Sequence, residues 1–197
     1  MKIRFCFYKA KIDGKFLDNA IAAWTGLFPC NWGTPPYSHV EVWFPNLISG
    51  ENGDEFGSFG RGLLWSSSTR GRKWPGVRCG FPSEILKHPE RWVILEFDGL
   101  DEREVKKAAL WCHSQIHKSY DFAGIFGFFW PWPWPWNTQK DDDWYCSTFG
   151  AKVAWLLRLT SKLWKRISPR RLWRKLEQSF GHQGITMHWD KDSKTWK

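Results

Sequence analysis

The spacing of apolar residues changes along the chain, and this change limits the fold more than any other feature. Before residue 98, five short runs alternate apolar with other side chains, the period of a half-buried β-strand. From residue 101 onward, apolar residues recur every three or four positions, as on one face of a helix. Strands followed by helices favour an α+β domain with an antiparallel sheet of about five strands.

The individual elements follow from these periods and from local start signals. Asp101 precedes two acidic residues and is expected to cap a helix, and Ser168 followed by Pro169 is a second helix start. The predicted strands cover residues 2–8, 38–44, 62–68, 76–79 and 91–97. The predicted helices cover residues 16–25, 122–129 and 146–166, with one more after Asp101 and a short basic one after Ser168.

Charge divides the chain into two unequal parts. Residues 1–146 contain 17 basic and 17 acidic side chains, whereas residues 147–197 contain 12 basic and 3 acidic ones. The length suits one domain, so we predict a single domain over 1–180, with 147–180 as a basic helical extension, and a loosely ordered tail over 181–197. The basic excess suits an anionic partner such as lipid headgroups, wall polymers or nucleic acid. A solvated helix face explains it equally well.

Cysteine usage and the first residues point to the cytoplasm as the place of synthesis. Five cysteines stand at irregular spacings without a CxxC pair, so we expect no disulfide framework, no metal site and no cofactor. Free thiols suit a reducing compartment. The first nine residues lack the apolar core of a signal peptide. Action at a membrane or wall, or as a virion component, stays open, because release by lysis or packaging leaves no such signal.

An uncharged segment over 122–139 ends in alternating tryptophan and proline over 130–136. Pro131, Pro133 and Pro135 deny it a continuous membrane-spanning helix. The strip suits an aromatic loop that stacks on sugars or bases or anchors at a lipid interface; a lid or simple packing on the domain are the alternatives. We favour partner binding, since four indoles on a stiff strip do not all face inward easily.

The candidate chemistry lies in a cysteine that opens a helix and a histidine on a strand. At a helix start, the dipole and free amides favour ionisation of Cys146 and can donate to an oxyanion. His39 and Glu41 project from the same strand face, about 7 Å apart, so the carboxylate is placed to orient the imidazole. The serines of 66–68 are an alternative orienting partner. The non-catalytic alternatives are that Cys146 is a buried packing residue and that His39 is a hydrogen-bonded strand histidine beside a solvated Glu41.

Other chemical candidates are weaker. Cys112 is expected on the inward face of its helix, where it packs. His113 and His117 are one helical turn apart, but we expect them to face solvent rather than a metal ion. No phosphate loop, paired-aspartate motif or His-Glu-x-x-His motif is present.

Three short motifs follow one another in an order that is informative. They are residues 37–41 (YSHVE), 118–124 (KSYDFAG) and 144–147 (WYCS), with further matches at 76–78 and 167–169. This order resembles the circularly permuted branch of the papain-like NlpC superfamily, which includes small bacterial and phage amidase-like proteins and is related to the lecithin retinol acyltransferases. The resemblance covers most of residues 1–176. Ordinary papain-like enzymes place the cysteine helix before the histidine strand, whereas here the histidine comes first.

The resemblance implies a permuted papain-like fold, with Cys146 as the nucleophile and His39 as the general base. The third residue varies in the superfamily, and strand geometry favours Glu41. The residues expected to contact substrate are Tyr37, Trp144 and Tyr145. The implied enzyme is a thiol hydrolase of amidopeptidase type, or an acyltransferase, acting on an amide or peptide bond, first in bacterial cell-wall material and second in an N-acyl lipid or lipid ester.

A non-catalytic alternative is a membrane- or wall-binding protein on a papain-like scaffold. Its apolar stripe would lie in an interface beside the basic side chains of 152–175. The stripe consists of Val153, Leu156, Leu157, Leu163 and Trp164. Nucleic-acid binding depends on net charge and aromatic content alone, so we expect no specific nucleic acid.

Overall fold

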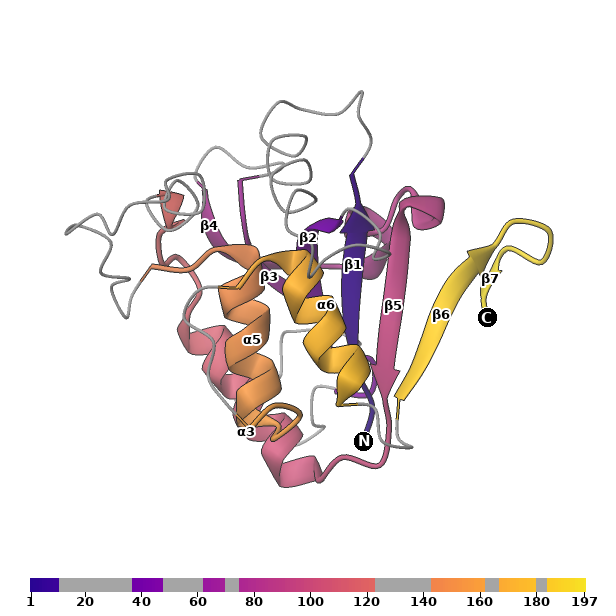
Figure 1. Cartoon of the computed structure of the whole chain (residues 1–197). Helices are drawn as coiled ribbons and strands as arrows, with labels where there is room; N and C mark the ends of the chain where they lie inside the picture. The colour runs from indigo at the N-terminus through magenta and orange to yellow at the C-terminus, as the bar shows by residue number, and fades with distance from the viewer. Residues whose placement is uncertain (11–36, 48–61, 70–74, 123–142, 162–166, 180–183) are drawn as a thin grey trace.

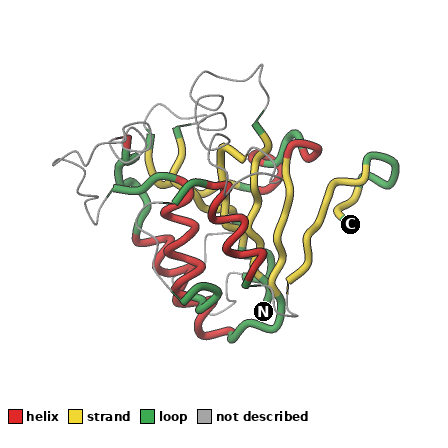
Figure 2. The backbone as a smooth tube through the Cα atoms, in the orientation of Figure 1, coloured by secondary structure: helices red, strands yellow, loops and turns green. Residues whose placement is uncertain are grey.

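The computed structural model describes residues 1–10, 37–47, 62–69, 75–122, 143–161, 167–179 and 184–197. Within these ranges the chain is an α+β domain whose sheet carries its three longer helices on one side (Figures 1 and 2). The sheet is antiparallel, and its strands follow the order β4-β3-β2-β1-β5-β6-β7. The strands are β1 (Ile3–Lys9), β2 (Tyr37–Trp43), β3 (Leu64–Ser68), β4 (Gly76–Gly80), β5 (Trp92–Phe97), β6 (Gly184–Asp190) and β7 (Thr195–Trp196).

The helices begin where the local sequence supplies a cap. The Asp101 carboxylate accepts the amide proton of Arg103 at 2.7 Å, and the Ser168 hydroxyl accepts that of Arg171 at 3.2 Å. Both predicted caps are therefore confirmed. The helices are α2 (Pro82–Ile85), α3 (Glu102–Ser114), α5 (Cys146–Leu156) and α6 (Pro169–Gln178), with a 3-10 turn, η2, at Pro89–Arg91.

The five predicted strands are confirmed, with ends that differ by at most two residues, but the expected sheet of about five strands is corrected to seven in the described residues, because β6 and β7 add to it. Their alternation gives the sheet two apolar faces. The helix face carries Phe7 opposite Val40 and Val93, in the main core with α3, α5 and α6. The other face carries a smaller apolar cluster that includes Trp92 and Ile94. The sheet therefore separates two environments, and each side chain's position along its strand decides which one it enters.

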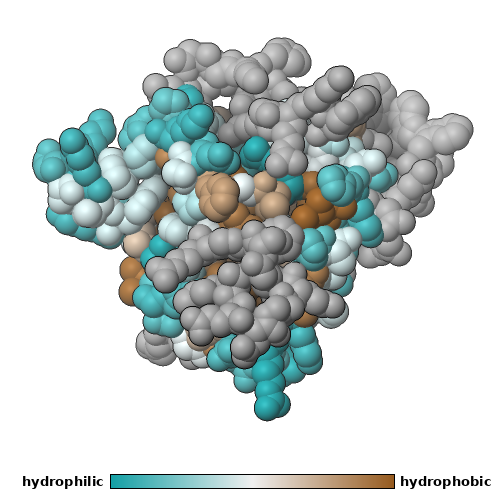
Figure 3. All heavy atoms as spheres, turned by 180° about the vertical axis from the view of Figure 1, so that it is seen from behind, coloured by the Kyte–Doolittle hydropathy of each residue, from teal (hydrophilic) through white to brown (hydrophobic). Residues whose placement is uncertain are grey.

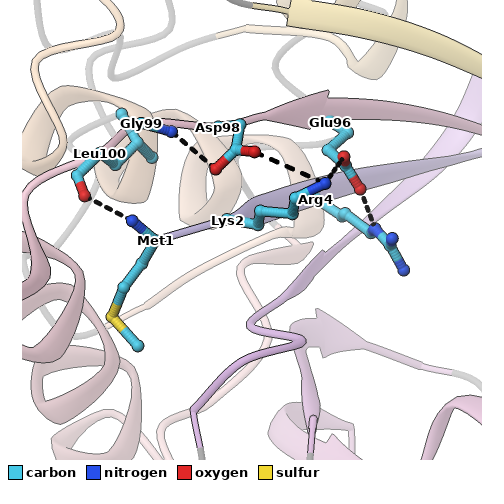
Figure 4. Close-up of polar contacts among 7 residues, drawn as sticks. All are labelled: Met1, Lys2, Arg4, Glu96, Asp98, Gly99 and Leu100. Carbon is cyan, nitrogen blue, oxygen red and sulfur yellow. Dashed lines mark hydrogen bonds and ion pairs between the residues drawn. The ribbon is translucent and has the colours of Figure 1, made fainter.

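The N-terminal residues are fastened to β5 by charged groups (Figure 4). Lys2 Nζ lies 2.7 Å from one oxygen of Glu96, and Arg4 Nε lies 2.6 Å from the other. Burial opposes ionisation of Glu96, but these two hydrogen bonds and charges hold its pKa below the ordinary value. The Met1 ammonium donates to the Leu100 carbonyl at 2.7 Å. These bonds link the first residues of the chain to the turn that precedes α3.

The predicted basic extension over 147–180 is corrected, because its helices form part of the core. Phe149, Val153 and Leu172 are completely buried in the main apolar cluster. Apolar positions every three or four residues turn toward the sheet, which leaves most of the described basic positions at least partly exposed, although Arg170 is buried. The stripe proposed for a membrane interface is affected too, since Val153 and Leu157 are buried in the core. Its members Leu163 and Trp164 lie outside the described residues.

The cysteine helix ends at Leu156, ten residues before the predicted end. Arg158 adopts a left-handed conformation with φ 56°. Its amide donates to the Trp155 carbonyl at 3.0 Å, and the Leu159 amide donates to the Ala154 carbonyl at 2.9 Å. These bonds make a Schellman ending, which glycine usually provides.

The predicted loosely ordered tail is also corrected, because 184–190 and 195–196 are strands. β6 runs antiparallel to β5, with Thr186 opposite Leu95. Its backbone groups find partners in the exposed edge of β5, which an isolated polar tail lacks. The predicted helices at 16–25 and 122–129, and the tryptophan–proline strip at 130–136, lie almost wholly outside the described residues. Among those that are described, no helix combines the length and apolar character needed to cross a bilayer.

Candidate functional site

His39 and Glu41 form a buried pair on the sheet face opposite α5. They are two positions apart on β2, and His39 Nε2 lies 2.7 Å from Glu41 Oε1. The imidazole is 4% exposed and the glutamate 0%. The prediction that the two side chains share a face is confirmed. A strand fixes both backbones, so their relative position does not depend on a loop.

Arg78 joins this pair from β4, two strands away. Its Nη2 lies 3.0 Å from Glu41 Oε1, the same oxygen that meets His39. Burial opposes ionisation of Glu41, but the hydrogen bond and charge of His39, together with those of Arg78, hold its pKa below the ordinary value. The site therefore contains a buried carboxylate ion with two donors on one oxygen. The sequence motif at 76–78 included Arg78 without suggesting this role.

Two adjacent serines on β3 contact two separate parts of the candidate site. Ser66 Oγ is 3.4 Å from His39 Nε2 and donates to the Val40 carbonyl at 2.9 Å. Glu41 is therefore the closer partner of the imidazole. Ser67 Oγ donates to the Trp144 carbonyl at 2.5 Å. Adjacent residues of β3 therefore contact His39 and the segment that precedes Cys146.

A pocket of about 200 Å³ opens on the His39 face. Trp92 lines it, and the centroid of its ring lies 5.1 Å from that of Tyr8 and 6.4 Å from that of His39. Arg91 packs over the Tyr8 ring and donates to its hydroxyl. Figure 3 views the molecule from this side, away from α5 and α6. The described lining consists of Tyr8, His39, Glu41, Arg78, Glu84, Ile85, His88 and Trp92.

Cys146 is the first residue of α5, as predicted, and it is 4% exposed. The start of the helix is held firmly on both sides. The Tyr145 amide donates to Thr148 Oγ1 at 3.2 Å, and the Ile167 amide donates to the Tyr145 hydroxyl at 3.1 Å. Ser147 Oγ donates to the Ile167 carbonyl at 2.5 Å. The thiol therefore stands on a fixed backbone at the positive end of a helix.

α5, which begins at Cys146, packs against β2, the strand that carries His39. Gly150 lies one helical turn after Cys146, and a Cβ built on it would come within 3.4 Å of Val40, the neighbour of His39. Val40 faces the helices, whereas the imidazole contacts Glu41 on the other face. The structure thus brings α5 across the histidine strand, with the thiol in the main core and the imidazole lining the pocket.

Two of the three residues expected to contact substrate are packing residues. Tyr37 is 1% exposed and packs on Trp173, with ring centroids 4.9 Å apart. Tyr145 is 2% exposed and is fixed by its hydroxyl, as described above. Both expectations are therefore corrected, because aromatic rings beside the motifs complete the core. Trp144 is half-buried and donates from Nε1 to Gln115 Oε1 at 3.1 Å.

The remaining thiols and histidines give no second centre among the described residues. Cys6, Cys79, Cys112 and Cys146 are not in disulfide bonds. Burial raises the pKa of Cys6, helped by the nearby Glu41 charge, and burial raises that of Cys112, so both stay protonated. His113 packs on Trp65, with ring centroids 6.1 Å apart, so its expected exposure is only partial. No group of His, Cys, Asp and Glu in the described part of the chain suits a metal ion.

Comparisons of the chain with family models, curated proteins and solved structures find no match.

Proposed function

We propose that the protein is a cysteine-dependent hydrolase or acyltransferase. Cys146 is the nucleophile, His39 the general base and Glu41 the orienting carboxylate. The observation that carries the proposal is the buried His39–Glu41 pair, 2.7 Å apart, on a strand crossed by the helix that Cys146 opens. A buried carboxylate bonded to one imidazole nitrogen sets the tautomer and stabilises the imidazolium, which is how orienting acids act in such sites.

The bond to Glu41 decides which nitrogen acts as the base. A neutral imidazole has one ring proton, and Glu41 accepts it from Nε2. The lone pair then lies on Nδ1, the nitrogen nearer to the β2 backbone. Because the thiol lies in the main core and the imidazole lines the pocket on the other face of β2, transfer of the Cys146 proton to Nδ1 requires the imidazole to turn past the N-terminal end of β2 toward the start of α5. Glu41 stabilises the positive charge that this transfer creates. The fold that accompanies this proposal is a permuted papain-like one, in which the cysteine helix packs across the histidine strand.

The reaction then takes two steps. The Cys146 thiolate attacks a carbonyl carbon, a C–S bond forms, and the C–N or C–O bond breaks as His39 returns its proton to the leaving group. Amides at the start of α5 stabilise the oxyanion. Water or an amine, deprotonated by His39, attacks the thioester and regenerates the thiol. The proposed substrate is a peptide or amide bond in cell-wall material, with a lipid amide or ester second.

The decisive experiment measures the iodoacetamide alkylation rate of each cysteine near pH 6 by mass spectrometry. Cys79 is more exposed than Cys146, so exposure alone predicts that Cys79 reacts first. A thiolate at Cys146 reverses this order, and we expect it to react at least about tenfold faster than Cys79. His39→Ala should remove that preference. The proposal fails if Cys79 is the faster thiol, or if His39→Ala leaves the Cys146 rate unchanged.

Substrate class is then tested by incubating wall fragments and acyl lipids with the wild type. Cys146→Ala is the control that keeps the surface and removes the nucleophile. Release of an amine or acid by the wild type alone identifies the class of bond. Sedimentation with wall or vesicles that survives Cys146→Ala, without any release, would favour the non-catalytic alternative instead.

A further inference from the structure

We propose that Arg78 is a positioning residue for the His39–Glu41 pair. Its guanidinium holds Glu41 Oε1 against His39 Nε2 and balances the carboxylate charge, so that the imidazole remains a neutral base. The part this plays in catalysis rests on the proposed function. The placement itself does not, because it concerns only three side chains on one face of the sheet.

The geometry at the carboxylate is unusual because one oxygen takes both contacts. His39 Nε2 and Arg78 Nη2 lie 2.7 and 3.0 Å from Oε1 of Glu41. Oε2 of Glu41 and Nε of Arg78 are buried without hydrogen-bond partners among the described residues. A carboxylate usually shares such partners between its oxygens. Here the guanidinium and the imidazole together fix the rotation of the carboxylate.

The sheet gives Arg78 a direct route to Glu41. Arg78 lies opposite Ser66 in the β3–β4 register, and Ser66 contacts His39 from the strand between them. The small serine side chain leaves room for the guanidinium to pass over β3 toward β2. Three neighbouring strands therefore present the arginine, the serine and the histidine pair on one face.

The surroundings of His39 supply a matched control. Arg91 carries the same charge on the same side of the sheet, but it contacts Tyr8 rather than Glu41. Removing Arg91 changes the local charge without touching the pair. The titratable and charged groups that face His39 are Cys6 and Tyr8 from β1, Glu41 from β2, Arg78 from β4, Glu84 from α2, and His88 after it.

The test is an NMR titration of ¹⁵N-histidine in the full chain carrying Cys146→Ala. Without the guanidinium, the buried carboxylate has the imidazole as its main cationic partner, which favours the imidazolium. We therefore expect Arg78→Met to raise the titration midpoint of His39 by about one pH unit and to weaken its Nε2–H tautomer preference. Arg91→Met should move the midpoint by less than about 0.3 units, since its guanidinium contacts Tyr8 and not the His39–Glu41 pair.

Arg78→Lys keeps the charge and covers the case in which Arg78→Met does not fold. We expect its midpoint to stay within about 0.3 units of the starting protein, because a lysine ammonium still balances the carboxylate. The inference is overturned if Arg78→Met leaves midpoint and tautomer unchanged, if Arg91→Met shifts them equally, or if Arg78→Lys shifts the midpoint by a full unit.

The two proposals fail separately. The titration uses a protein without the Cys146 thiol, so its outcome does not depend on catalysis. If Arg78→Met shifts His39 as expected but Cys146 in the otherwise native chain shows no selective alkylation, the positioning role stands and the enzyme proposal falls. If alkylation of Cys146 is selective but Arg78→Met leaves the titration midpoint of His39 unchanged, the enzyme proposal stands and the positioning role of Arg78 falls.

Discussion

Glu41→Gln removes a buried charge while it keeps the shape of the side chain. The variant turns two charge-assisted hydrogen bonds, of 2.7 and 3.0 Å, into bonds with a neutral acceptor. Bonds to a charged group contribute about 1.5–3 kcal/mol and neutral ones about 0.5–1.5 kcal/mol, so each bond loses about 1 kcal/mol. We therefore expect the free energy of unfolding to fall by about 2 kcal/mol at pH 7, which lowers Tm by about 4–8 °C.

The size of this loss depends on pH in a defined direction. Burial opposes ionisation of Glu41, but His39 and Arg78 hold its folded pKa below the ordinary value. The stabilisation is complete above the unfolded carboxyl pKa, about 4.3, and is lost as pH falls through the lower folded value. Glutamine does not titrate. The difference between wild type and variant should therefore close in this acidic window.

Urea unfolding followed by tryptophan fluorescence measures both effects, since the chain contains 17 tryptophans. The control is Glu102→Gln, which breaks an exposed pair with Lys106 and should change the free energy of unfolding by less than about 0.5 kcal/mol. Equal stability of Glu41→Gln and wild type at pH 7 would refute the reasoning. So would a difference of the same size at pH 7 and pH 3.

Three further predictions concern the framework around the site. In Gly76→Ala the new Cβ would lie 2.3 Å from the Lys118 carbonyl oxygen, so we expect the free energy of unfolding to fall by about 1–3 kcal/mol. Urea unfolding measures this loss, and an unchanged unfolding midpoint would contradict the predicted clash. At Gly150, a Cβ alone would already lie 3.2 Å from Leu172 and 3.4 Å from Val40. Gly150→Leu should therefore lower Tm and slow the alkylation of Cys146, and the milder control Gly150→Ala should have a smaller effect on both. Removal of 184–197 uncovers the β5 edge and should produce aggregation on size-exclusion chromatography, whereas a stable monomer would show that β6 adds little.

Local sequence signals were sufficient to predict much of the secondary structure. The alternation in 2–8 and 38–44 predicts strands because each side chain's direction depends only on its own position. Asp101 and Ser168 predict helix starts because a cap bonds to amides two or three residues away. His39 and Glu41 were paired for the same reason, since two positions along one strand always share a face.

Features that depend on distant pairing were not predictable. Arg78 reaches Glu41 only because β3 pairs with both β2 and β4, and no residue near Arg78 in the sequence shows this strand order. β6 was not predicted because its partner strand, β5, lies about ninety residues earlier in the chain. The side chains of β6 are only partly buried or exposed, so its sequence lacks a clear apolar alternation. The early end of the cysteine helix depends on Arg158 in a left-handed conformation, where neither glycine nor asparagine marks the stop.

The central position of β1 has a consequence for synthesis on the ribosome. The first strand to emerge must wait for β5 to occupy its second edge, because Phe7 lies opposite Val93. Its apolar face stays bare until α6, which begins at Pro169, has also left the exit tunnel. Nascent chains of this protein should therefore be prominent chaperone clients, and a premature stop codon ahead of α6 should yield a product for degradation rather than a shorter working domain.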